Sequence, residues 1–227
     1  MGLAAASYAE GLIRALLAQK DELRMIFAAA PSQNEVLKNL AQSPNIPWER
    51  IHAFHMDEYV GLDPAAPQGF GNFLRDRLFG LVPFKSVHYL QEAEAYSELL
   101  REGEVDICCL GIGENGHIAF NDPPVADFND PQTVKVVELD SVCRQQQVND
   151  GCFASLDEVP THAMTLTIPT LFACSHLVCT VPAATKREAV RRLLTDAEIS
   201  TEVPATIMRR HPSVSLFLDS DSLPEFS

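Results

Sequence analysis

The stretch VDICCLGIGENGH, residues 105–117, joins an apolar run directly to a turn rich in glycine. The run from Val105 to Gly111 has the length of a strand and is apolar at successive positions, which is typical of a strand buried on both faces in a parallel sheet. The turn then places Gly113 and Gly116 ahead of His117. Because glycine lets backbone N–H groups approach an anion closely, the stretch predicts a buried strand that ends at a binding site.

Helical and strand patterns alternate on both sides of this stretch. A helix is expected before residue 20, where apolar positions recur at helical spacing, and a buried strand is expected in the apolar run from Leu23 to Ala30. Further helices are expected near residues 35–41, 69–79, 93–102 and 186–194, and further strands near residues 50–55, 86–90, 133–139, 176–181 and 213–219. This alternation predicts the α/β class, as a three-layer α/β/α sandwich around a mostly parallel sheet. No linker or repeat divides the chain, so residues 1–227 are expected to form a single domain.

The charge balance limits the classes of partner. Seventeen Lys and Arg residues face 31 Asp and Glu residues, for a formal net charge of −14. This charge repels nucleic-acid phosphates and anionic membrane surfaces, so neither is expected as a partner. A phosphorylated metabolite is still compatible, because a few backbone N–H groups and one or two cations suffice to bind it locally. Without a long apolar run or a signal-like start, the chain is expected to be cytoplasmic, and homo-oligomerisation is left open.

The six cysteines do not form a metal-binding or disulfide pattern. They contain no C-x-x-C pair, and several lie inside apolar runs. This distribution is more typical of buried free thiols than of zinc ligands or a disulfide framework. We therefore expect neither a metal nor a cofactor.

Polar residues follow three of the predicted strands, in the segments at residues 30–35, 55–59 and 111–117. Ligands of open parallel sheets bind beyond the carboxyl ends of the strands, so these segments are expected to meet at one edge. Taken singly, each polar side chain has an ordinary structural explanation. The glycines also match G-x-G-x-x-G, but the prolines Pro123 and Pro124 oppose the long helix of a dinucleotide site.

Two of these segments resemble a known family. HMDEYVGL at residues 55–62 and GIGENGHIAFN at residues 111–121 closely resemble the two signature stretches of glucosamine-6-phosphate deaminases, in the same order and at the same separation. Weaker similarity extends from about Leu23 to Asp219. The resemblance implies a modified Rossmann-like sheet. It also implies conversion of glucosamine 6-phosphate and water to fructose 6-phosphate and ammonia.

The resemblance also implies roles for individual residues. Asp57 matches the carboxylate that moves a proton between C2 and C1, and His117 matches the histidine that opens the sugar ring. Lys186 matches a phosphate-binding lysine, and Ser32 is the hydroxyl donor retained in the loop after the first strand. The remaining substrate contacts are assigned to Glu58, Gly113 and Gly116.

Two positions depart from the pattern of many family members and are assigned with the catalytic residues. Asn115 replaces an aspartate, and an amide can orient His117 but cannot stabilise its imidazolium by charge. Asp122 replaces a glutamate and is one methylene shorter. Together the two departures are expected to make ring opening, rather than the C2 proton transfer, the slower step. If Asp122 lies too far from His117, Asn115→Asp or Asp122→Glu is expected to improve turnover.

Two other functions on related folds remain as alternatives. A 6-phosphogluconolactonase also carries a Gly-x-x-Gly-His turn, but such lactonases continue differently after the histidine and lack the Asp57-Glu58-Tyr59 stretch. A non-catalytic sugar-phosphate sensor would have lost the catalytic groups, whereas Asp57 and His117 are present here. Release of ammonia from glucosamine 6-phosphate distinguishes the deaminase from both.

Overall fold

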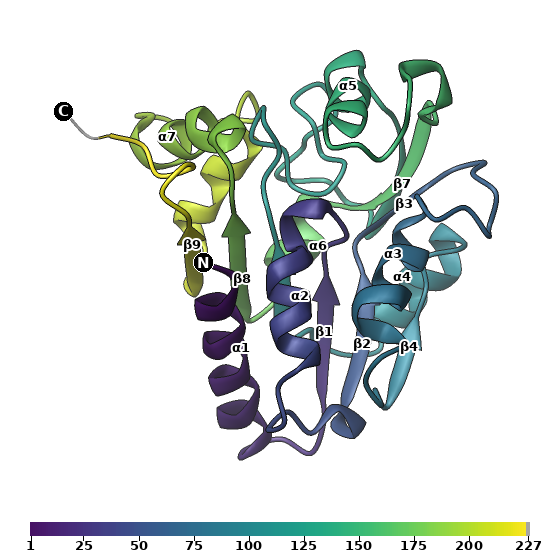
Figure 1. Cartoon of the computed structure of the whole chain (residues 1–227), viewed down its shortest axis with the longest axis vertical. Coiled ribbons are helices and arrows are strands. Elements are labelled where there is room, and N and C mark those ends of the chain that lie inside the picture. Colours follow the sequence, from purple (N-terminus) through teal and green to yellow (C-terminus); the bar gives the residue numbers. More distant parts are fainter. Residues whose placement is uncertain (226–227) are drawn as a thin grey trace.

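Six parallel strands form the central sheet of the computed structural model, which describes residues 1–225. Their spatial order is β4-β2-β1-β5-β8-β9, which becomes 3-2-1-4-5-6 when these six strands are numbered along the chain (Figure 1). This is the order of the doubly wound dinucleotide-binding fold. The strands are β1 (Leu23–Phe27), β2 (Ile51–His55), β4 (Ser86–His88), β5 (Ile107–Leu110), β8 (His176–Val181) and β9 (Val214–Leu218).

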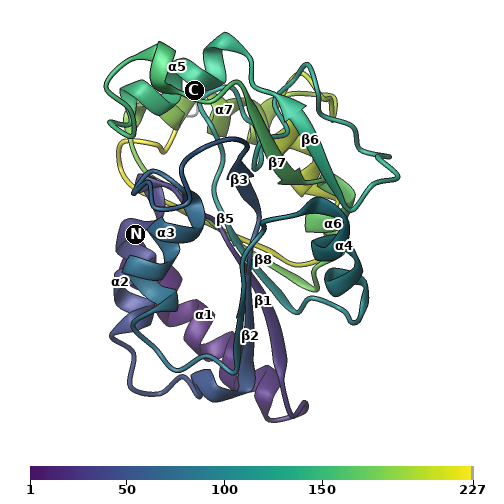
Figure 2. The same ribbon diagram turned by 90° about the vertical axis from the view of Figure 1, so that its right-hand side faces the viewer.

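Helices cover both faces of this sheet, because successive strand residues point to opposite sides. Met25 and Phe27 of β1 face one apolar cluster, whereas Ile26 faces the other. Figure 2 shows α1, α2 and α3 on one side of the strands and α4 and α6 on the other. The helices are α1 (Gly2–Leu17), α2 (Asn34–Ala41), α3 (Phe70–Leu74), α4 (Ala93–Arg101), α5 (Ser141–Asn149), α6 (Ile168–Phe172) and α7 (Arg187–Thr195). A π-helical turn, η3 (Arg75–Phe79), continues α3.

A second, antiparallel sheet lies beyond the carboxyl ends of the central strands (Figure 2). It consists of β3 (Asp57–Tyr59), β7 (His162–Leu166) and β6 (Val134–Glu138), in the order β3-β7-β6. β3 starts two residues after the end of β2, so the small sheet is joined directly to the central one. Its residues Tyr59, Val137 and Ala163 share an apolar cluster with the central sheet and with α1 and α2.

Short 3₁₀ turns complete the connections. They are η1 (Pro31–Gln33), η2 (Trp48–Arg50), η4 (Leu156–Glu158), η5 (Ala184–Lys186) and η6 (Pro204–Arg210). Within residues 1–225, none of the helices is long and apolar enough to cross a membrane.

The predicted fold class is confirmed, and most predicted elements agree with the structure to within a few residues. The strand expected at residues 133–139 exists as β6, but it belongs to the antiparallel sheet rather than the parallel one. Four elements were not predicted: β3, α5, β7 and α6. β3 has only three residues, and α5 is mostly polar, so neither produces a clear apolar period.

Candidate active site

The loops that follow β1, β2, β5 and β8 surround a cavity of about 300 Å³. β1 and β5 are neighbours in the sheet, and the strand order reverses between them. Ligands of open α/β sheets bind at such a reversal, because the loops on its two sides diverge and leave a crevice. The three polar segments that the sequence singled out are therefore brought together, and Ser32, Asp57, Gly113, His117 and Lys186 all line this cavity.

Asp57 begins β3 and is almost completely buried, with 7% of its surface exposed. Its Oδ1 atom has no hydrogen-bond partner among the described residues. Burial, together with the nearby charge of Glu58, raises the pKa of Asp57 well above its ordinary value of 3.8. A carboxylate with a raised pKa and a free oxygen at the wall of a cavity can accept a proton from a bound molecule.

His117 is held by two oxygen acceptors on one side of its ring. Its Nδ1 atom lies 2.9 Å from Oδ1 of Asn115 and 2.9 Å from Oδ1 of Asp122. Both oxygens can only accept a hydrogen bond, so Nδ1 carries the hydrogen. In the neutral ring Nε2 is then the acceptor, which leaves it free to exchange a proton in the cavity.

Asn115 links His117 and Asp122 by hydrogen bonds. Its Oδ1 atom also accepts the backbone N–H of His117 at 3.0 Å, and its Nδ2 atom donates to Asp122 at 2.9 Å. Neither Asn115 nor Asp122 lines the cavity. They lie behind His117, so we assign them to positioning and charge stabilisation rather than to contact with a substrate.

The shorter side chain of Asp122 reaches His117 because the intervening loop turns back on itself. The N–H of Asn121 donates to the carbonyl of Ile118 at 3.1 Å, and Ala119 adopts a positive φ of 50°. The sequence left open whether the loop compensates for the missing methylene, and it does. Burial alone would raise the pKa of Asp122, but the charge and hydrogen bond of His117 and the other donors more than offset this, so the pKa is lowered.

The two glycines of the signature turn have different tasks. Gly113 lines the cavity, and a Cβ atom built on it would lie 2.1–2.3 Å from three ring atoms of His117. Gly116 has a φ of +83° and does not line the cavity, and a Cβ there would meet Val203 at 2.5 Å. Gly116 therefore serves the turn itself, and its expected substrate contact is not retained.

We expect Gly113→Ala to lower kcat by about 100-fold or more, because the added methyl group displaces the His117 ring and small displacements of catalytic groups are costly. Steady-state kinetics and circular dichroism would measure activity and fold separately. Gly11→Ala in α1 is the matched control, since nothing lies within 4 Å of the added Cβ. Near-normal kcat in Gly113→Ala would contradict the tight placement of His117.

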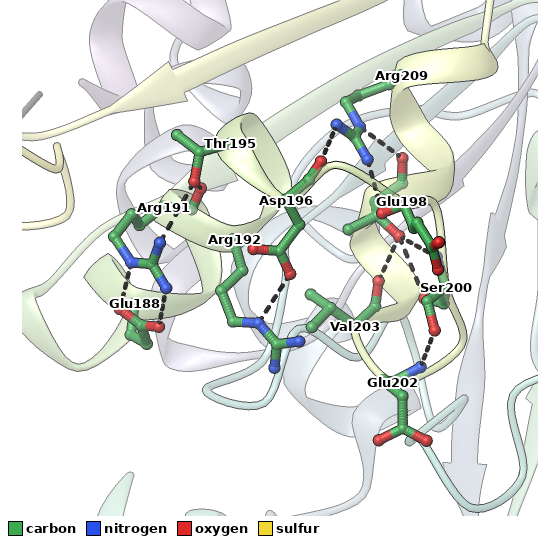
Figure 3. A network of polar contacts seen from close by, with 11 residues as sticks. Glu188, Arg191, Arg192, Thr195, Asp196, Glu198, Ser200, Glu202, Val203 and Arg209 are labelled. Carbon is green, nitrogen blue, oxygen red and sulfur yellow. Dashed lines mark hydrogen bonds and ion pairs between the residues drawn. The ribbon is translucent and has the colours of Figure 1, made fainter.

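Figure 3 shows a network of polar contacts that joins α7, the loop after it and η6. The guanidinium of Arg209 donates to the carbonyls of Asp196 at 2.6 Å and Glu198 at 2.9 Å. These bonds fix η6 against the loop that follows α7. The N–H of Ala205 in η6 donates to the carbonyl of Gly116 at 2.8 Å. The network therefore supports the turn that carries His117.

Lys186 and Ser32 line the same cavity from the loops that follow β8 and β1. Lys186 is only 6% exposed, and none of the described carboxylates lies within 4 Å of its ammonium group. Burial lowers the pKa of Lys186, and the charges of Asp150 and Glu114 offset part of this effect. A buried cation without an ion pair is suited to an anionic ligand.

Glu58 does not lie in this cavity. It follows Asp57 in β3 and so points to the opposite face, where it lines a separate cavity. Its carboxylate accepts the backbone N–H groups of Tyr59, Phe70 and Gly71 at 2.8–3.0 Å. Glu58 therefore fixes the start of α3, and we do not retain it as a substrate contact.

Several residues that line the cavity were not predicted from the sequence. Gln146 and Gln147 lie on α5, Asp150 follows α5, and Thr185 precedes Lys186. The only local sign of α5 is its N-cap, Asp140, which accepts the N–H of Cys143 at 2.7 Å. Because α5 is mostly polar, its sequence shows no regular spacing of apolar residues that would have predicted the helix and the glutamines on it.

The cysteines form neither disulfides nor part of a metal-binding cluster among residues 1–225. All six cysteines are free thiols, and five are buried, as expected. Within residues 1–225, no cluster of three or more His, Cys, Asp or Glu side chains has a metal-binding arrangement.

Comparison with known proteins identifies relatives of this chain. The family model for glucosamine-6-phosphate isomerases and 6-phosphogluconolactonases matches residues 1–216. A glucosamine-6-phosphate deaminase of Exiguobacterium sp. is 40% identical over 177 residues, which cover 74% of this chain and 67% of the relative. One from Bacillus cereus strain G9842 is 36% identical over 182 residues, which cover 77% of this chain and 67% of the relative.

Solved structures agree with this assignment. A monomeric glucosamine-6-phosphate deaminase aligns with a TM-score of 0.86 and 27% identity, covering 97% of this chain and 93% of the other. A 6-phosphogluconolactonase from Thermotoga maritima shares the fold with a TM-score of 0.74 at 21% identity, covering 97% and 93%. On the match of residues 1–216 and the similarity to these deaminases, the chain belongs to the glucosamine-6-phosphate isomerase/6-phosphogluconolactonase family.

Proposed function

We propose that this chain is a glucosamine-6-phosphate deaminase, which converts glucosamine 6-phosphate and water to fructose 6-phosphate and ammonia. The observation that carries the proposal is the pairing of two proton-transfer groups in one cavity: the buried Asp57 carboxylate and the His117 ring, whose Nδ1 is fixed from behind. The named relatives are deaminases of this kind.

His117 is proposed to open the sugar ring. Its Nε2 atom accepts the proton of the anomeric hydroxyl and returns it to the ring oxygen, while the bond between C1 and that oxygen breaks. The imidazolium formed between these transfers lies next to the carboxylate of Asp122, which stabilises its charge. The amide of Asn115 holds the side chains of His117 and Asp122 in place, because it is hydrogen-bonded to both.

Asp57 is proposed to carry out the isomerisation. It removes the proton from C2 of the open-chain amino sugar and delivers it to C1. A proton passes from the amino nitrogen to the aldehyde oxygen, so that C1 becomes a hydroxymethyl group and C2 an imine. Water then adds to C2 and ammonia leaves, which completes the ketose. The raised pKa of Asp57 suits this role, because the same group must both accept and release a proton near neutral pH.

The phosphate is proposed to bind to Lys186 and the hydroxyl of Ser32, with backbone N–H groups at the starts of α2 and α7. Thr185 offers a further hydroxyl at the same end of the cavity. The phosphate then lies at the β1 and β8 side, and the reacting carbons lie toward Asp57 and His117.

The test of the proposed function is the reaction itself. Purified protein should release ammonia and fructose 6-phosphate in equal amounts from glucosamine 6-phosphate. If the protein hydrolyses 6-phosphogluconolactone and releases no ammonia from glucosamine 6-phosphate, the lactonase is favoured. If it binds the sugar phosphate without turnover, a sensor is favoured. Either result would overturn the proposal.

We expect Lys186→Ala to raise KM for glucosamine 6-phosphate by about 10- to 100-fold with a smaller effect on kcat, because a charge-assisted bond to the phosphate is lost. Arg187→Ala is the matched control: it removes the same charge from the next residue, which is exposed and does not line the cavity. Equal KM values for the two variants would remove Lys186 from the phosphate site.

A further inference from the structure

Two adjacent glutamines of α5 line the active-site cavity, but their amide groups differ in how they are used. Gln146 is engaged at both ends: its Oε1 atom accepts the N–H of Glu114 at 3.1 Å, and its Nε2 atom lies 3.4 Å from Asp150. Gln147 is engaged at one end. Its Oε1 atom accepts the hydroxyl of Tyr59 at 2.9 Å, and its Nε2 atom has no hydrogen bond to any described residue.

The side chain of Gln147 is held firmly. Gln147 is 7% exposed, and Tyr59 is 4% exposed. The ring of Tyr59 packs against Phe70, Phe120 and Phe153, with centroid distances of 4.8, 5.5 and 5.4 Å. The tyrosine hydroxyl therefore has a fixed position, and it fixes the amide that it contacts.

This amide is connected through Tyr59 to the strand that carries Asp57. Tyr59 follows Asp57 by two residues in β3, so both side chains leave the same face of that strand. Gln147 is thus linked through Tyr59 to the strand that carries Asp57, whereas Lys186 enters the cavity after β8.

We propose that Gln147 is a specificity-determining residue whose Nε2 group donates a hydrogen bond to a hydroxyl of the bound sugar, and that Tyr59 positions it for this contact. The inference rests on the proposed function for the nature of the ligand. An amide donor that lines the cavity without a protein partner, and whose other end is already fixed, favours a ligand that brings an acceptor to it. The donor is neutral and Lys186 already offers a charge for the phosphate, so the proposed partner of the amide is a sugar hydroxyl.

The test compares two ligands by calorimetry, fructose 6-phosphate and inorganic phosphate. Gln147→Leu should weaken binding of fructose 6-phosphate about tenfold and leave the affinity for inorganic phosphate unchanged. Gln145→Leu is the matched control, since Gln145 is exposed on the same helix and does not line the cavity. An equal loss of affinity for both ligands in Gln147→Leu would indicate a structural role and overturn the inference. An unchanged affinity for fructose 6-phosphate would overturn it as well.

The positioning role of Tyr59 is tested by a double-mutant cycle. Tyr59→Phe should weaken fructose 6-phosphate binding by a smaller factor, and adding it to Gln147→Leu should cause little further loss, because the two side chains act through one contact. Additive losses would contradict that coupling. Ammonia release by the wild type separates the two proposals. Its absence overturns the deaminase assignment. If the wild type releases ammonia but Gln147→Leu binds fructose 6-phosphate with wild-type affinity, only the inference on Gln147 is overturned.

Discussion

Asp57→Asn should lower kcat by about two to four powers of ten while leaving the affinity for fructose 6-phosphate nearly unchanged. The asparagine amide keeps the shape of the side chain but cannot accept the C2 proton, and removal of a general base typically costs this much. Steady-state kinetics gives kcat, and calorimetry gives the affinity for the product. Near-normal turnover would show that Asp57 is not the proton-transfer group.

The same substitution should stabilise the fold at neutral pH. Because burial raises the pKa of Asp57, the folded protein binds this proton more tightly than the unfolded chain does. The wild type therefore loses stability as pH rises from the ordinary carboxyl pKa of 3.8 through the folded-state pKa, and Asp57→Asn does not. Its melting temperature should exceed that of the wild type at pH 7, and the difference should shrink as pH falls toward 4. A lower melting temperature at pH 7 would contradict this account of the buried carboxylate.

Asp122→Asn should lower kcat by about 100-fold, the second largest effect that we expect. Asp122 supplies the only negative charge in the group that holds His117, since Asn115 is neutral. Its loss leaves the imidazolium formed during ring opening without a counter-charge, and the second amide can also turn its N–H group toward Nδ1. Wild-type kcat, with an unchanged pH–rate profile, would show that Asp122 is not coupled to His117.

The stability effect of Asp122→Asn should have the opposite sign to that of Asp57→Asn. The pKa of Asp122 is lowered in the fold, so its carboxylate contributes stability above the ordinary pKa of 3.8, and this stability is lost as pH falls through the folded-state pKa. The variant should melt at a lower temperature than the wild type at pH 7, and the two should converge in acid. Thermal melts of both variants across the same pH series would test the two signs together.

The two departures from the family pattern now have a structural explanation. The sequence suggested that Asn115→Asp or Asp122→Glu would improve turnover if Asp122 lay too far from His117. Because Asp122 lies 2.9 Å from Nδ1 and is 3% exposed, that condition is not met. A longer glutamate would crowd a filled space, and an aspartate at position 115 would place two carboxylates side by side. Both substitutions are therefore expected to lower turnover.

Most of the parallel sheet was predictable because strands such as β1, β5 and β8 are short apolar runs that alternate with helical segments. The stretch from Val105 to His117 carried both the strand and its catalytic turn in one local pattern. The antiparallel sheet was not predictable in the same way. The strand at residues 133–139 could be recognised, but its pairing with β7, and that of β7 with the three-residue strand β3, joins distant segments and leaves no local period.

The sequence by itself determined the α/β class, the residues of the two signature stretches, and the presence of Asp57, His117, Ser32 and Lys186 near the strand ends. Only the tertiary structure decided which of these side chains share a cavity. Alternation along β3 directs Asp57 into the cavity and Glu58 away from it, and the register of that short strand is set by its pairing with β7. The reach of Asp122 depends on the turn at Ile118 to Asn121, and the role of Gln147 depends on a hydroxyl 88 residues away in sequence. Contacts of this kind depend on packing between distant segments, which no local pattern encodes.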